Sequence, residues 1–147
     1  MFLPFGSVQN MPTIGFLTSD LMFHSRVSQS ISDLREAGAE ATLVVNRNIE
    51  TLIQKIAEST DGRLVIIDLA LRELDVQGVV NVIREKLPSV SIIAYGPHVA
   101  GALLQSAADA GIDAVYTRGQ FDHRMTEIIQ EYSLNDASTD RCNPPET

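Results

Sequence analysis

Apolar residues recur along the chain in two patterns that alternate with each other. Short runs that are apolar on both alternating faces predict strands buried on both sides, as in the middle of a parallel sheet. Five such runs lie at residues 13–18, 41–46, 63–68, 90–95 and 113–118. The segments after each run carry apolar residues at spacings of three and four, which predicts helices that bury one face. The pattern therefore indicates five strands that alternate with five helices.

The expected helix ends carry residues that favour capping. Asn48 and Asp75 each precede a helix, and side-chain oxygens at that position accept hydrogen bonds from free backbone N–H groups. Gly38 follows the first helix and Pro88 follows the third, where glycine and proline commonly stop a helix. We expect the last helix to begin near Phe121.

The strict alternation of elements predicts right-handed crossovers and a doubly wound parallel sheet. We expect a flavodoxin-like (βα)5 fold with three α/β/α layers and strand order 2-1-3-4-5. The predicted domain spans residues 11–134, and residues 1–10 are expected to form a loose extension. Residues 135–147 are almost wholly polar, which predicts a disordered tail.

Composition narrows the class of protein. The chain has 147 residues, 44% of them hydrophobic, which suits one domain with a real core. No stretch approaches the ~18 apolar residues of a membrane span, and the first residues do not resemble a signal peptide. These features predict a cytoplasmic protein.

Charge and chemistry-bearing residues exclude further classes. The net charge of −8, with scattered Lys and Arg, argues against nucleic-acid binding. Cys142 is the single cysteine, so an internal disulfide is excluded. His24, His98 and His123 are widely separated and do not have the spacing of a zinc site.

Polar residues stand at the ends of four of the predicted strands. In an open parallel sheet, ligands bind beyond the carboxyl ends of the strands. The expected strand order brings the ends of strands one, three, four and five together. Asp20, Asp68, Gly96 and Arg118 would then surround one shallow crevice.

The chain from about Thr13 to Tyr132 resembles the receiver (response-regulator) domain of bacterial two-component signalling. The resemblance rests on Leu-Val-Ile-Ile-Asp at residues 64–68, on Ala-Gly-Ile-Asp-Ala at residues 110–114, and on Arg118. It implies that the aspartate ending strand three accepts a phosphoryl group from a histidine kinase. It also implies an acidic pair that helps to hold Mg²⁺, a Ser or Thr ending strand four, and a Lys ending strand five. Metal and ammonium charges would neutralise the developing oxyanions.

The sequence keeps only part of that arrangement. Asp68 matches the phosphoacceptor, whereas Ser19 and Asp20 supply one carboxylate in place of two. Gly96 stands where a hydroxyl residue is expected, and Arg118 stands in place of lysine. The resemblance therefore indicates a degenerate member, a pseudo-receiver, with a weak Mg²⁺ site at Asp20 and Asp68.

Each candidate residue also has a purely structural interpretation. Asp68 can cap the loop after its strand, and Asp20 can cap the following helix, where an acidic side chain also suits the helix dipole. Arg118 can pair with either carboxylate. His98 is either an added component of the crevice or an exposed loop residue. Tyr116 matches the family's switch aromatic by position, and it also fits a partly buried structural tyrosine.

The leading hypothesis is a stand-alone signalling module of a phosphorelay or related pathway that acts by protein–protein interaction. Its expected partners are a histidine kinase or a downstream effector, with a homodimer through residues 98–132 as a further option. No enzyme activity is expected beyond phosphorylation and dephosphorylation of Asp68. The alternative is a flavodoxin-like module that binds a nucleotide or another phosphate-bearing ligand, although Gly-x-Gly-x-x-Gly is absent. The sequence does not identify the kinase, effector or pathway.

Overall fold

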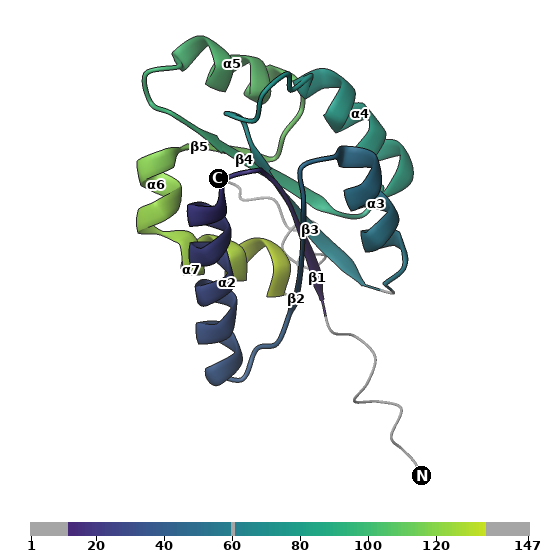
Figure 1. Ribbon diagram of the computed structural model, residues 1–147, viewed down its shortest axis with the longest axis vertical. Helices are drawn as coiled ribbons and strands as arrows, with labels where there is room; N and C mark the ends of the chain where they lie inside the picture. The colour runs from purple at the N-terminus through teal and green to yellow at the C-terminus, as the bar shows by residue number, and fades with distance from the viewer. Residues whose placement is uncertain (1–11, 60, 135–147) are drawn as a thin grey trace, which may run out of the picture.

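The computed structural model describes residues 12–59 and 61–134, and Figure 1 shows their arrangement. The predicted extension at residues 1–10 and the predicted tail at residues 135–147 lie outside the described residues. The described residues hold one sheet of five parallel strands in the order β2-β1-β3-β4-β5. The predicted flavodoxin-like fold and its strand order are therefore confirmed.

The strands and helices follow one another in the predicted alternation. The strands are β1 (Thr13–Leu17), β2 (Thr42–Asn46), β3 (Gly62–Asp68), β4 (Ser91–Gly96) and β5 (Ala114–Thr117). The helices are α2 (Leu21–Glu36), α3 (Ile49–Ala57), α4 (Val76–Lys86), α5 (Gly101–Asp109), α6 (Arg118–His123) and α7 (Met125–Ile129), followed by the π-helical turn η1 (Gln130–Leu134). Within residues 12–59 and 61–134, no helix has both the length and the apolar character that a bilayer crossing requires.

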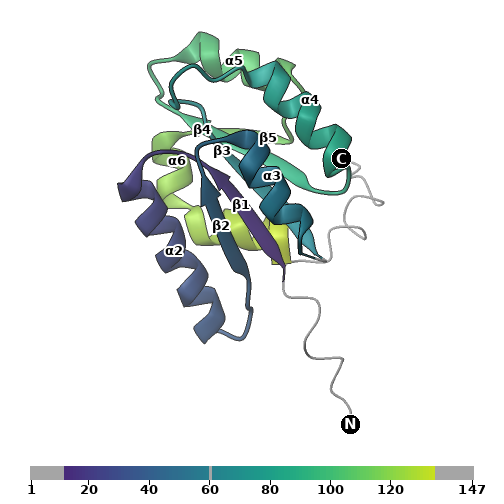
Figure 2. The same cartoon turned by 45° about the vertical axis from the view of Figure 1, so that its right-hand side comes forward.

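The helices cover both faces of the sheet. Figures 1 and 2 show α2, α6 and α7 on one side and α3, α4 and α5 on the other. Strands β1 and β4 are buried along their whole length, and β3 is buried from Leu64 to Asp68. Each large apolar side chain removed from water in this way stabilises the fold by about 1.5–3 kcal/mol. The continuous apolar runs in the sequence therefore mark the centre of the sheet.

The two cores differ in composition. The side covered by α2, α6 and α7 holds aromatic rings, among which Tyr95 and Phe121 stack with centroids 4.9 Å apart and planes 7° apart. The other side holds mainly aliphatic residues. There, α3 packs so closely on β1 that a Cβ at Gly15 would lie 2.3 Å from Ile56 Cδ1. A larger residue at position 15 would force the Ile56 side chain to move.

The predicted helix caps are present. The Asn48 side chain accepts a hydrogen bond from the Thr51 N–H at 2.9 Å, and that of Asp75 accepts one from the Gly78 N–H at 3.2 Å. Gly38 follows α2 with a φ of 98°, a left-handed conformation that glycine adopts without steric cost.

The segment from β5 to α7 differs from the prediction in two ways. Strand β5 stops at Thr117, and a helix begins at Arg118 rather than near Phe121. The reason is a capping box, in which the Gln120 N–H donates to Thr117 Oγ1 and the Thr117 N–H donates to Gln120 Oε1. The predicted single helix is also interrupted at Arg124, which separates α6 from α7. Arg118 is therefore a helix residue and not a strand residue.

Candidate functional site

Asp68 ends the central strand β3 with only 3% of its surface exposed. The Thr18 hydroxyl donates a hydrogen bond to its Oδ2 at 2.6 Å, and the Ala70 N–H donates to its Oδ1 at 2.9 Å. A buried carboxylate needs such donors to replace lost hydration. The side chain of Asp68 is thus held from the end of β1 and from the loop that follows β3, which agrees with the loop-capping interpretation.

Asp20 begins α2 and has two functions there. Its Oδ1 accepts hydrogen bonds from the N–H groups of Met22 at 2.9 Å and Phe23 at 3.2 Å. Its Oδ2 accepts from Arg118 Nη2 at 2.5 Å. Burial by itself raises the pKa of Asp20, but the hydrogen bonds from Phe23, Arg118 and Met22 outweigh that effect. The pKa of the Asp20 carboxyl therefore lies below its ordinary value of 3.8.

Thr18 connects the two carboxylates. Its Oγ1 accepts a hydrogen bond from the Asp20 N–H at 2.9 Å, and the same hydroxyl donates a hydrogen bond to Asp68. Sequence reasoning included Thr18 only as a neighbour of Ser19 and Asp20. Its position as the first residue after β1, on the edge where Asp68 ends β3, is the signal that points to it.

Arg118 is fixed by Asp20 and by an aromatic ring. Its guanidinium carbon lies 4.5 Å from the centroid of Phe23, within the range of a cation–π contact. Its side chain is 39% exposed. The structure thus selects Asp20 from the two predicted partners of Arg118. We call Thr18, Asp20, Asp68 and Arg118 the Asp68 cluster.

Gly96 ends β4, and the space above it is already filled. A Cβ at this residue would lie 3.2 Å from Leu69 Cβ and 3.4 Å from Leu104 Cδ2. Leu69 is held there because its N–H donates to the Tyr95 carbonyl at 2.9 Å. A serine or threonine in place of Gly96 would require Leu69 to shift by a few tenths of an ångström, whereas Leu104 lies at ordinary contact distance, so the packing favours glycine here.

Tyr95 is a site residue that sequence reasoning missed. It pairs in register with Asp68 and is fully buried, and its hydroxyl lies near the Thr18 side chain without forming a hydrogen bond of normal geometry to a described residue. Burial raises the pKa of the phenol strongly, and the negative charge of Asp68 adds to the shift. A tyrosine inside an otherwise apolar buried strand, directly before Gly96, is the sequence signal for this residue.

The remaining predicted site residues lie outside the Asp68 cluster. Ser19 is exposed on the side toward β2, and His98 is exposed in the loop before α5. Tyr116 is half-buried in β5, with its ring centroid 6.4 Å from that of Phe121. Burial and the neighbouring Tyr132 hydroxyl raise the pKa of Tyr116. The functional roles predicted for Ser19, His98 and Tyr116 stay predictions.

The arrangement does not suit Mg²⁺ as it stands. Mg²⁺ requires several oxygen ligands in near-octahedral geometry. Among the described residues, no group of three or more His, Cys, Asp and Glu side chains is placed to hold a metal ion. Both Asp68 oxygens accept protein hydrogen bonds, and Asp20 is shared between α2 and Arg118. The contacts of both carboxylates therefore disfavour the weak Mg²⁺ site, which stays a prediction.

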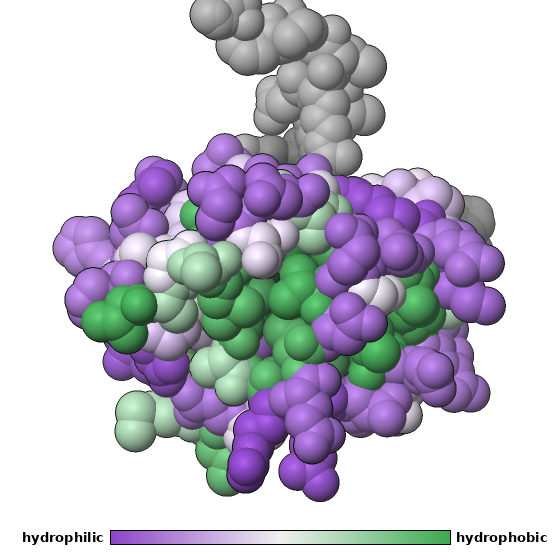
Figure 3. Space-filling model, turned by 90° about the horizontal axis from the view of Figure 1, so that it is seen from above, coloured by the Kyte–Doolittle hydropathy of each residue, from purple (hydrophilic) through white to green (hydrophobic). Residues whose placement is uncertain are grey.

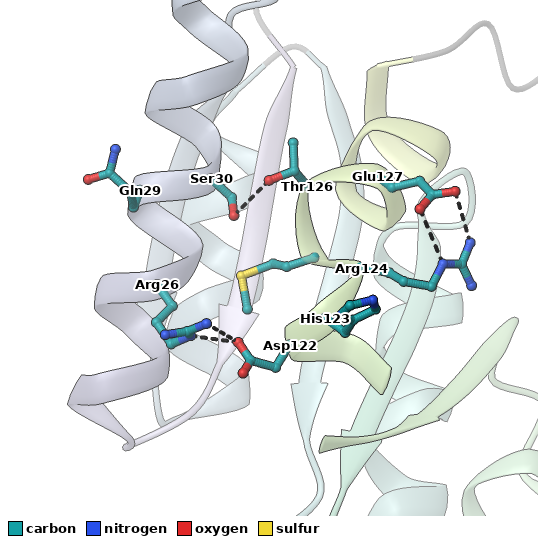
Figure 4. Close-up of a pocket in the computed structure, with 9 residues that line it drawn as sticks. Arg26, Gln29, Ser30, Asp122, His123, Arg124, Thr126 and Glu127 are labelled. Atoms are coloured by element: carbon teal, nitrogen blue, oxygen red, sulfur yellow. Dashed lines mark hydrogen bonds and ion pairs between the residues drawn. The ribbon is translucent and has the colours of Figure 1, made fainter. Parts of the chain in front are cut away.

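A recess of about 490 Å³ lies between α2 and the α6–α7 segment, away from the Asp68 cluster. Figure 4 shows that polar side chains from these helices bind one another in and around it. The pairs are Arg26–Asp122, Ser30–Thr126 and Arg124–Glu127. Because these groups satisfy one another, we interpret the recess as a seam between packed helices.

Comparison with known proteins adds a fold-level relationship. No protein-family model and no curated protein matches the chain in sequence. The signal receiver domain of an HD domain-containing protein from Pseudomonas fluorescens Pf-5 superposes with a TM-score of 0.71 at 21% identity, over 94% of this chain and 97% of that one. A response regulator from Thermotoga maritima gives 0.66 at 14% identity, over 83% of this chain and 97% of that one.

A CheY-like response regulator receiver domain protein from Methanospirillum hungatei JF-1 gives a TM-score of 0.65 at 15% identity, over 83% of this chain and 93% of that one. The chain therefore has the fold of receiver domains. At these identities the similarity concerns the fold alone, and a function must be argued from the site.

Proposed function

We propose that the chain is a receiver-like signalling module that acts by protein–protein interaction. In this proposal Asp68 occupies the phosphoacceptor position of an incomplete phosphosite. The observation that carries the proposal is a carboxylate, 3% exposed, at the carboxyl end of the central strand of a receiver-type fold. Chemistry in open parallel sheets is concentrated at that edge.

The contacts of Asp68 favour a site that is incomplete for phosphoryl transfer. One carboxylate oxygen would have to attack the donor phosphorus, but each already accepts a protein hydrogen bond. The nearby cation, Arg118, is bound to Asp20. The two hydrogen bonds leave a lone pair on each oxygen but lower its nucleophilicity, and attack by Asp68 would require an additional positive charge to neutralise the phosphoryl oxygens. We infer that the module exerts its ordinary function without phosphorylation of Asp68.

Exposed apolar side chains at the carboxyl edge of the sheet support the proposed mode of action. Leu21 and Met22 begin α2 with 79% and 71% of their surface exposed, and Val99, before α5, is 81% exposed. Both helices start at the carboxyl edge of the sheet. Single exposed apolar residues are common, but three large ones at one edge favour a contact site. The proposed partner is a histidine kinase or a downstream effector.

A second copy of the chain is a further proposed partner, through residues 98–132. Strand β5 lies at the edge of the described sheet, and its four residues are half-buried. Leu103 and Leu104 of α5 are also half-buried. Figure 3, which looks down on the end of the molecule where α4 and α5 lie in Figure 1, shows apolar side chains surrounded by polar ones. Such a surface fits an interface with an apolar centre and a polar rim.

NMR titration with Mg²⁺ and beryllofluoride, a phosphoryl mimic, tests the state of the phosphosite. We expect no chemical-shift change around Asp68 at millimolar Mg²⁺. Shifts that spread from Asp68 to Gly96, Tyr116 and Arg118 would instead establish a conventional receiver, and the pseudo-receiver proposal would be wrong.

Partner capture by the full chain tests the mode of action. Asp68→Asn should retain partner binding, because the proposed contact does not use the Asp68 charge; the amide oxygen can accept only one of the two hydrogen bonds that Thr18 and the Ala70 N–H donate, so the variant's folding is checked first. The double variant Leu21→Ser with Met22→Ser should lose it, whereas Lys55→Ser, an exposed change on α3, should not. A strictly monomeric protein that recovers no partner sensitive to either surface would overturn the proposed function.

A further inference from the structure

A second recess opens on the same edge of the sheet as the Asp68 cluster. It has a volume of about 350 Å³, and we call it the arginine pocket. It is lined by Ser19, Arg47, Asn48, Leu71, Arg72 and Glu73. None of these side chains belongs to the Asp68 cluster.

The arginine pocket lies where this type of fold commonly binds ligands. Its lining residues follow the carboxyl ends of β1, β2 and β3. The chain leaves β1 through α2 on one face of the sheet and leaves the neighbouring strand β3 through α4 on the other face (Figure 2). The strand order therefore reverses between β1 and β3, and ligands of open α/β sheets bind beyond the strand ends at such a switch point.

The two arginines of the pocket have no partner in the part of the chain that the structure describes. Neither Arg47 nor Arg72 forms an ion pair or a hydrogen bond with another residue that the structure describes, and both are exposed. In contrast, five other arginines pair with carboxylates: Arg26, Arg63, Arg84, Arg118 and Arg124. In a chain with a net charge of −8, two arginines that have no partner among the described residues and line one recess, together with one carboxylate at Glu73, leave a local excess of positive charge.

Other features of the pocket add to its preference for anions. Ser19 is exposed and brings a hydroxyl to the same recess. Helix α3 begins at Ile49, directly after Asn48, so its N-terminus is adjacent, but the acidic Glu50 in its first turn offsets the positive end of the dipole. Glu73 acts in the opposite direction, because its carboxylate lines the pocket without pairing with either arginine.

We propose that the arginine pocket binds a phosphate-bearing small molecule. Arg47 and Arg72 would hold the phosphate oxygens, and the Ser19 hydroxyl would donate a further hydrogen bond. Two planar guanidinium groups match the charge and the several acceptor oxygens of a phosphate dianion. The volume, about 350 Å³, is at the lower end of ligand pockets and leaves room for a small group attached to the phosphate.

Ligand binding in the arginine pocket would act on Asp68 through two short connections. Arg72 belongs to the loop after β3, whose Ala70 N–H donates to Asp68 Oδ1 and whose Leu71 N–H donates to the Asp68 carbonyl. Ser19 directly follows Thr18, which donates to Asp68 Oδ2. The inference goes beyond the proposed function, because it gives the module an input that does not require a phosphorylated aspartate.

Titration of the full chain with inorganic phosphate and with adenosine 5′-monophosphate tests the proposal, at constant ionic strength and with adenosine as the phosphate-free control. We expect changes in the NMR chemical shifts of Ser19, Arg47 and Arg72 that saturate below about 10 mM ligand. Adenosine alone should cause none. Tighter binding of the nucleotide than of phosphate would indicate that the attached group is also recognised.

Substitutions separate specific binding from general charge attraction. Arg47→Gln and Arg72→Gln should each weaken binding by about tenfold, the loss of one charge-assisted contact. Glu73→Gln should strengthen it by about two- to threefold, since a repelling carboxylate is removed. Arg35→Gln removes an exposed arginine of α2 that has no ion pair with a described residue; it is the matched control and should leave binding unchanged.

Absence of saturable shifts, or equal weakening by Arg35→Gln and Arg47→Gln, would overturn the proposal. The result is separable from the proposed signalling function. Asp68→Asn should keep phosphate binding, and loss of partner capture in that variant would contradict the signalling proposal alone.

Discussion

The Asp68 cluster and the arginine pocket, both at the carboxyl edge of the sheet, differ in how their charged side chains are paired. In the Asp68 cluster every charged side chain has a protein partner. The Thr18 hydroxyl donates to Asp68, and Arg118 forms an ion pair with Asp20. In the arginine pocket, Arg47 and Arg72 have no partner among the described residues. The two regions adjoin through the consecutive residues Thr18 and Ser19.

The difference separates groups that hold the fold from groups that the fold does not need. A buried polar group must find a partner within the protein, and loss of that partner is costly. An exposed arginine is hydrated in both the folded and the unfolded chain, so it contributes little to folding. The Asp68 cluster should therefore respond to substitution with a change in stability, and the arginine pocket with a change in ligand binding.

The largest effect is expected for Thr18→Val. The change removes the donor to the buried Asp68 carboxylate and the acceptor for the Asp20 N–H. We expect a loss of about 2–3 kcal/mol in the free energy of unfolding. Urea denaturation with an unchanged m-value measures it. Thr18→Ser keeps the hydroxyl and is the control, and equal stability of the two variants would show that the Asp68 cluster does not depend on this hydrogen bond.

A change of opposite sign is expected for Tyr95→Phe. The hydroxyl is buried near the Thr18 side chain and forms no hydrogen bond of normal geometry to a described residue, while the ring stacks on Phe121. Removal of the oxygen should stabilise the protein by about 1 kcal/mol, because an unsatisfied buried polar group is lost and the ring is kept. Thermal and urea unfolding measure the gain. Tyr116→Phe, at a half-buried tyrosine, should have a smaller effect, and a destabilised Tyr95→Phe protein would point to a hydrogen-bond partner such as bound water.

The third prediction concerns the ion pair of Arg118 with Asp20. Arg118→Gln removes this pair and the contact with Phe23, and should lower stability by about 1 kcal/mol at neutral pH. Since the folded-state pKa of Asp20 lies below its ordinary value of 3.8, ionised Asp20 stabilises the fold above that pH. The contribution is lost as the pH falls through the folded-state pKa.

The difference in unfolding free energy between the wild-type protein and Arg118→Gln should therefore narrow as the pH falls below 3.8. Urea unfolding at a series of pH values measures this difference. Arg124→Gln breaks an exposed ion pair with Glu127 and should change stability less. A difference that stays constant with pH would assign the effect of Arg118→Gln to packing on Phe23 rather than to the charge of Asp20.

The sequence predicts the fold more completely than the contacts within the site. Apolar runs and cap residues such as Asn48 and Asp75 are local signals, and parallel topology then brings Asp20, Asp68 and Arg118 to one edge. This much follows from pattern and from the geometry of parallel sheets.

The contacts inside the Asp68 cluster depend on details that no spacing reveals. Arg118 reaches Asp20 from the first turn of a helix that starts early, because Thr117 and Gln120 cap it. The space above Gly96 is closed by Leu69, which belongs to a loop of irregular conformation. Side-chain packing between segments distant in sequence decides both features, so they become evident only in the structure.

The smallest effect on stability is expected in the arginine pocket. Arg47→Gln and Arg72→Gln, singly or together, should change the unfolding free energy by less than about 0.5 kcal/mol, as is usual for exposed residues without partners. Urea denaturation without ligand measures this. With phosphate present, the wild-type protein should gain stability by mass action and the double variant should not. A loss of more than about 1 kcal/mol in the unfolding free energy without ligand would mean that the arginines hold the loop after β3 in place. The Asp68 cluster and the arginine pocket would then both contribute to stability, contrary to the proposed difference between them.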